Sequence, residues 1–75
     1  MILKEGKNHH TYQVLSVNIE ETELEKRLQA LGLTVGSLIT VLNNDKKGSM
    51  TVKFRGTRFA IGKKIADHIQ ISEVQ

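Results

Sequence analysis

The chain has 75 residues, and its eleven lysines and arginines exceed its eight aspartates and glutamates to give a net charge of +3. Such a length accommodates a single domain over residues 1–75, and no apolar run approaches the ~20 residues of a membrane span. The absence of cysteine excludes disulfides, thiolate metal ligands and a thiol nucleophile. Because the first residues include charges and a glycine, we expect no export signal, no membrane insertion and a cytoplasmic location.

The first predicted element is a strand over residues 12–17, where β-favouring residues alternate ahead of the acidic pair Glu20 and Glu21. Both faces of this strand are partly apolar. That pattern is typical of a barrel strand whose outer side is partly covered by a helix or loop.

A helix is predicted next. Thr22 and Glu25 have the spacing of a capping box at the start of this helix. Gly32 ends the helix, because glycine adopts the left-handed conformation at little energetic cost. Such an ending would let Leu33 fold back onto the helix. Three leucines recur at i, i+4 and i+7, and we expect all of them on the face that packs against the core. They are Leu24, Leu28 and Leu31.

The second half of the chain alternates apolar and polar residues in short runs, which predict four more strands. The turn-favouring residues at 43–48 predict a hairpin between two of them. A single helical turn is expected at 62–67. The strands are expected over residues 37–42, 49–54 and 57–61 and through Ile69 and Ile71.

The strand over residues 49–54 has a clear buried face, because Met50, Val52 and Phe54 alternate with polar residues. Lys53 and Arg55 must then face outward, and Arg58 projects from the next strand. We expect these three cations to form a basic strip that binds an acidic partner surface. The alternative is an ordinary solvated sheet face.

Five short strands with one inserted helix predict a mainly β domain that forms a small closed or nearly closed barrel. Three segments carry a resemblance to the FeoA family. In that family a helix ends in a Leu-Gly-Leu step, a glycine precedes a strand rich in valine and isoleucine, and a late strand leads into a turn ending in alanine. The corresponding segments here are residues 27–36, 38–54 and 58–66.

The resemblance extends from about Gly6 to Val74, and it implies a five-stranded SH3-like barrel. It further implies a non-catalytic accessory role in bacterial ferrous iron uptake, through contact with the membrane transporter FeoB and its GTP-binding domain. No cofactor is required by this role. The same fold occurs as the C-terminal domain of iron-dependent repressors, so metal sensing is an alternative, although residues 1–75 include no DNA-binding domain.

The three histidines are weak candidates for a divalent metal such as iron. His9 and His10 are adjacent, and adjacent residues on a strand point to opposite faces, so they cannot easily share an ion. His68 could add a third imidazole, with Asp67 as an oxygen ligand. No recognised ligand spacing supports this site, and we expect the His pair to lie in a solvated loop.

Neither an enzyme nor a nucleic-acid binder is favoured. Glu20 and Glu21 are expected to stabilise the positive N-terminal end of the predicted helix. The sequence contains neither a nucleophile with an oriented base nor a phosphate-binding glycine loop.

The basic charge makes a small nucleic-acid-binding barrel the rival interpretation. Only 4% of the residues are aromatic, and both phenylalanines are assigned to the core, so stacking surfaces are lacking. We expect a protein partner and no nucleic acid, with the oligomeric state open.

Overall fold

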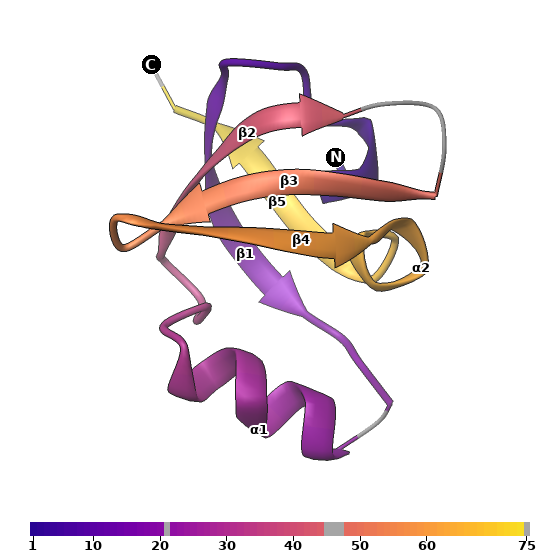
Figure 1. Cartoon of the computed structure of the whole chain (residues 1–75). Coiled ribbons are helices and arrows are strands. Elements are labelled where there is room, and N and C mark those ends of the chain that lie inside the picture. Colours follow the sequence, from indigo (N-terminus) through magenta and orange to yellow (C-terminus); the bar gives the residue numbers. More distant parts are fainter. Residues whose placement is uncertain (21, 45–47, 75) are drawn as a thin grey trace.

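The computed structural model describes residues 1–20, 22–44 and 48–74. For Thr22 it describes the backbone only and not the side chain. The elements follow the chain in an order that matches the sequence-based prediction except for a short 3-10 helix at the N-terminus (Figure 1). They are η1 (Leu3–Glu5), β1 (Thr11–Val17), α1 (Thr22–Ala30), β2 (Leu38–Asn44), β3 (Ser49–Phe54), β4 (Thr57–Gly62), α2 (Lys63–Ala66) and β5 (Ile69–Glu73).

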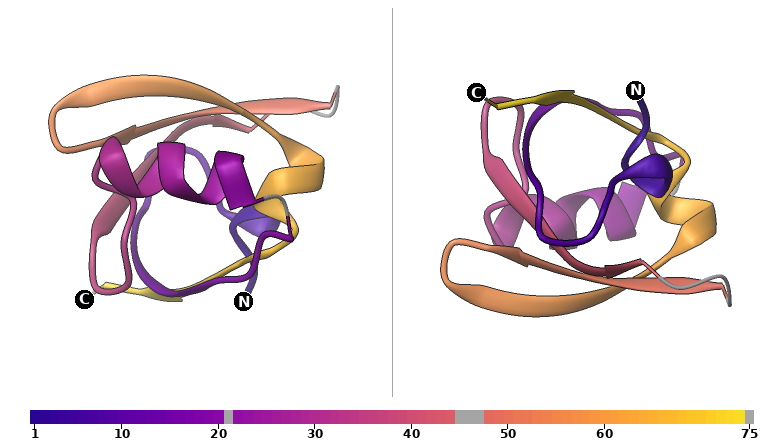
Figure 2. Two further views of the ribbon diagram at one scale, coloured as in Figure 1. Left: turned by 90° about the horizontal axis from the view of Figure 1, so that it is seen from below. Right: turned by 90° about the horizontal axis from the view of Figure 1, so that it is seen from above.

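The five strands form one antiparallel sheet in the order β4-β3-β2-β1-β5. The predicted hairpin is confirmed by the pairing of Asn44 with Met50, although its turn at residues 45–47 lies outside the described part of the chain. Both β1 and β2 contain register irregularities, between Val14 and Ser16 and between Val41 and Asn43. Such bulges increase the local twist, and Figure 2 shows the strands curving around a common interior.

The sheet does not close on itself, so the expectation of a closed barrel is met only loosely. The two edge strands, β4 and β5, are separated by α2, which contacts β4. The N-terminal segment runs along the outer side of β5, where Ile2 pairs with Gln70 and the Ile71 N–H donates to the Met1 carbonyl at 2.7 Å. With α2 and the N-terminal segment in these positions, β4 and β5 do not pair. The chain therefore forms a curved, open SH3-like sheet.

One cluster of buried side chains fills the interior, and it includes the predicted inward face of β3. Leu3, in η1, is fully buried and was not predicted to be part of the core. The buried apolar residues are Leu3, Tyr12, Val14, Leu28, Leu33, Ile39, Val41, Met50, Val52, Phe54, Ile61, Ala66, Ile69 and Ile71.

The end of α1 has the predicted glycine conformation. Gly32 has a φ of 103°, its N–H donates to the Gln29 carbonyl at 3.0 Å, and the Leu33 N–H donates to the Leu28 carbonyl at 2.9 Å. These two bonds make a Schellman ending, which turns the chain so that Leu33 packs in the core beside Leu28.

The prediction that Leu31 packs in the core is wrong, because its side chain is 40% exposed. The helix ends at Ala30, so Leu31 is the C-cap residue and no longer follows the helical stripe. Leu24 and Leu28 do pack on the core. The capping box at Thr22 depends on a side chain outside the described part.

Candidate functional site

Two exposed cations stand opposite each other on the outer face of the β3–β4 hairpin. Lys53 and Arg58 are cross-strand partners, and both are exposed, while their neighbours Val52 and Phe54 point inward and are buried. We call Lys53 and Arg58 the basic pair. Within the part of the chain that the structure describes, neither cation has an ion-pair partner. Like charges directly opposite in a sheet destabilise it by a fraction of a kcal/mol, so the fold itself gains nothing from this arrangement.

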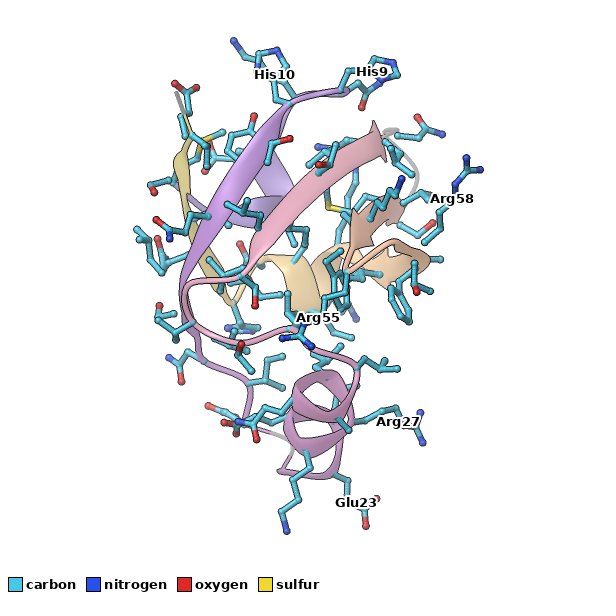
Figure 3. The ribbon with its side chains drawn as sticks, turned by 90° about the vertical axis from the view of Figure 1, so that its left-hand side faces the viewer. His9, His10, Glu23, Arg27, Arg55 and Arg58 are labelled. Atoms are coloured by element: carbon cyan, nitrogen blue, oxygen red, sulfur yellow. The ribbon has the colours of Figure 1, made fainter. Side chains whose placement is uncertain are left out.

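Arg55 does not extend this strip as predicted. It has a φ of 54° and is followed by Gly56 with a φ of 77°, values that belong to a two-residue type I′ turn between Phe54 and Thr57. The turn directs the Arg55 side chain toward the end of α1, whereas Arg58 projects away from the body of the molecule (Figure 3).

The stem of Arg55 packs against Gly32, since a β-carbon built on Gly32 would collide with Arg55 Cδ and lie 2.7 Å from Nε. Gly32 follows the last turn of α1, where the helix dipole favours a cation. Arg55 therefore has a structural role at the end of the helix, and the predicted three-residue strip reduces to the basic pair.

The face around the basic pair carries small or polar side chains. Thr51 and Ala60 form the next cross-strand pair on the same face, and Ala60 is exposed. No cavity or pocket is found among the described residues. This arrangement suits contact with another macromolecule rather than the enclosure of a small molecule.

The predicted histidine candidates lie at opposite ends of β1. His9 and His10 are in the turn before β1, where the His10 N–H donates to the Lys7 carbonyl at 3.2 Å, and both rings extend outward (Figure 3). His68 lies beside the other end, because its carbonyl accepts from the Asn18 N–H at 2.9 Å. Seven strand residues separate the two places, a distance of roughly 20 Å. The structure therefore does not bring His68 and Asp67 together with the His pair.

The loop placement predicted for the His pair agrees with the structure, and His9 is in the left-handed region with a φ of 66°. The His10 ring lies 6.3 Å from the Tyr12 ring at an interplanar angle of 21°. Among the described residues, no group of three or more His, Asp or Glu side chains could hold a metal ion.

We expect Fe²⁺ or Zn²⁺ at micromolar concentration to change the melting temperature of the chain little. A metal that binds only the folded state must stabilise it by RT ln(1 + [L]/Kd), so thermal denaturation with and without metal measures the effect. The matched control is the variant in which His9, His10 and His68 are replaced by alanine. A rise of many degrees that this variant loses would make metal sensing the leading function.

The acidic pair that precedes α1 consists of Glu20 and Glu21. Glu20 is exposed, and Glu21 lies outside the described residues.

No helix among the described residues is long and apolar enough to cross a membrane.

Sequence reasoning missed one surface feature, a set of exposed apolar side chains near the place where β1 and β2 pair. Leu15, Val35 and Leu38 are 50, 69 and 55% exposed. The Gly36 N–H donates to the Val14 carbonyl, and Gln13 pairs with Leu38, so these residues border the same stretch of β1. The only signal in the sequence is that β1 is apolar on both faces, which also fits a strand that is covered on its outer side.

Comparison with known proteins agrees with this fold. The family model described as the FeoA domain matches residues 1–73. A crystal structure of an iron uptake regulatory protein, FeoA, superposes with a TM-score of 0.87 at 27% identity and covers 99% of this chain and 97% of its own. The solution structure of the FeoA protein from Chlorobium tepidum gives a TM-score of 0.89 at 26% identity, over 100% of this chain and 71% of that one. No curated protein sequence matches.

The fold is also shared with part of a transcriptional repressor. A manganese-dependent transcriptional repressor superposes with a TM-score of 0.87 at 16% identity. The superposition covers 99% of this chain but only 41% of the repressor. At this identity the likeness concerns the fold alone.

Proposed function

Because the chain belongs to the FeoA family, whose members are small accessory proteins of iron transport and not enzymes, we propose that it binds FeoB, the membrane transporter of ferrous iron. In this proposal the chain acts in the cytoplasm by protein–protein contact, with no cofactor of its own. Regulation of the GTP-binding domain, or assembly of the transporter, would then follow from where the chain docks.

The observation that carries the proposal is the exposed basic pair on the outer face of the β3–β4 hairpin. These two cations, which have no ion-pair partner among the described residues, repel each other at a distance of about 4.5 Å between their Cα atoms. An acidic partner surface would relieve that repulsion. The arginine adds a planar fork of donors that can hold a carboxylate in a bidentate manner. A net charge of +3 favours the approach of such a partner.

The direct test measures binding of this chain to the purified cytoplasmic domain of FeoB by titration calorimetry at several salt concentrations. We expect saturable binding that weakens as salt rises, because charge complementarity is screened. A single-stranded oligonucleotide is titrated in parallel. Binding to the oligonucleotide but not to the FeoB domain would contradict the proposal and favour the nucleic-acid interpretation.

A further inference from the structure

The outer edge of β4 has hydrogen-bonding groups that the sheet does not use. In an antiparallel ladder, opposite residues alternate between hydrogen-bonded pairs, whose N–H and C=O groups bond to each other, and non-hydrogen-bonded pairs, whose groups point away from each other. The Lys63 N–H donates to the Gly48 carbonyl at 2.9 Å, which makes Ser49 and Gly62 a non-hydrogen-bonded pair. By alternation along the register, Arg58 and Ala60 also stand in such pairs, and their N–H and C=O groups point away from β3.

The sheet order places β4 at an edge, so these groups of Arg58 and Ala60 face outward. The opposite edge, β5, is lined by the N-terminal segment through Ile2 and Met1. No such backbone pairing is found for the outer edge of β4 among the described residues, and both views of Figure 2 show this strand along the rim of the molecule. An unpaired edge of this kind is a template for another strand.

The charges beside this edge indicate what kind of strand it accepts. A strand added next to β4 would place a side chain opposite Arg58, on the same face as the basic pair. An acidic side chain there would relieve the repulsion between Lys53 and Arg58. A second copy of this chain fits poorly, because antiparallel pairing of two β4 edges through Arg58 and Ala60 would gather both basic pairs on one face.

We propose that β4 binds an extended, acidic segment of a protein partner by strand addition, with the backbone of Arg58 and Ala60 as its hydrogen-bonding site. Main-chain bonds supply affinity in this mode, and the side chain that meets Arg58 supplies selectivity. The identity of the partner as FeoB rests on the proposed function, whereas the edge and its charge do not.

Ala60→Pro tests the backbone contact. Proline removes the outward N–H of Ala60 without removing a bond to β3, and edge strands accept proline at such positions. We expect this variant to bind the cytoplasmic domain of FeoB about tenfold or more weakly, the effect of losing about 1.4 kcal/mol. Ala60→Thr is the matched control, since it changes the side chain but keeps the N–H, and its affinity should stay close to that of the unaltered chain.

Amide hydrogen exchange, measured by NMR on the unaltered chain, keeps the test independent of how well the proline variant folds. We expect the amides of Arg58 and Ala60 to exchange rapidly in the free chain and slowly in the complex, while that of Phe59, bonded to β3, is protected in both. Binding to the FeoB domain without this protection, and with full affinity in folded Ala60→Pro, would overturn strand addition but leave the proposed function in place.

A second probe separates the two proposals further. A synthetic peptide that alternates glutamate and threonine should shift the amide signals of Arg58 and Ala60, and the same peptide with lysine for glutamate should not. If the glutamate peptide shifts these signals but the chain does not bind the FeoB domain, the result would support the edge site and contradict the FeoB partnership. Equal effects of both peptides, or none from either, would overturn the acidic edge site.

Discussion

Leu28→Ala is expected to lower the free energy of unfolding by about 2–5 kcal/mol, as measured by chemical denaturation. Leu28 is 8% exposed and belongs to the core cluster, and its carbonyl accepts the Leu33 N–H that closes the end of α1. The substitution leaves a cavity where the helix packs on the sheet. A domain of this size has a total stability of about 4–11 kcal/mol, so the variant would lose a large fraction of it.

Leu31→Ala is the matched control, because it makes the same chemical change three residues later in the chain. Leu31 is 40% exposed, so we expect a loss below about 1 kcal/mol. The comparison measures docking of the helix separately from the general effect of removing a leucine. Equal losses in the two variants, or a loss under about 1 kcal/mol for Leu28→Ala, would show that α1 is not docked as the structure describes.

Local signals made most of the β structure predictable from the sequence. The strand β3 has the predicted bounds because apolar and polar residues alternate strictly from Met50 to Phe54. The end of α1 was predictable because Gly32 is followed at once by the leucine that its left-handed turn buries. In both places a short run of residues contains the whole physical reason for the structure.

The features that were not predicted depend on contacts between distant segments. Leu3 is one apolar residue in a three-residue helix, which is too short to show periodicity, and its burial depends on the rest of the core. The open sheet likewise depends on how the N-terminal segment meets β5, through the pairing of Ile2 with Gln70. Alternation within single strands cannot reveal either contact.

The candidate site was predictable in part. Alternation correctly placed Lys53 on the outer face, and the hairpin register brought Arg58 opposite it. Arg55 was misplaced because alternation was extended one residue beyond the end of β3, into the turn. Two-residue hairpin turns of type I′ favour Asn-Gly or Asp-Gly, so Arg55-Gly56 gave no strong signal for left-handed backbone there.

Reversing the basic pair is expected to remove binding to the cytoplasmic domain of FeoB. In Lys53→Glu/Arg58→Glu, attraction to an acidic surface becomes repulsion, and we expect the affinity to fall more than tenfold and to lose its weakening with salt. The stability of the chain should change little, because one exposed like-charge pair replaces another. Calorimetric titration and thermal denaturation measure the two quantities.

The matched control is Lys26→Glu/Lys64→Glu, which changes the net charge by the same amount at exposed positions on α1 and α2. We expect it to keep most of the affinity, since short-range contacts outweigh net charge at physiological salt. Unaltered affinity in the folded basic-pair variant would contradict the proposed interface. Loss in the control alone would move the interface to another face, with the exposed side of α1 around Lys26 as the next candidate.

Lys53→Glu alone separates binding from stability most sharply. The new glutamate faces Arg58 across the hairpin, and an opposite-charge cross-strand pair stabilises a sheet by about 0.2–1 kcal/mol. The same ion pair occupies the guanidinium of Arg58 and places a carboxylate where an acidic partner would bind. We therefore expect the melting temperature to rise while the affinity for the FeoB domain falls, a combination that loss of folded structure cannot produce. A variant that is both more stable and equally tight in binding would show that the basic pair faces solvent in the complex.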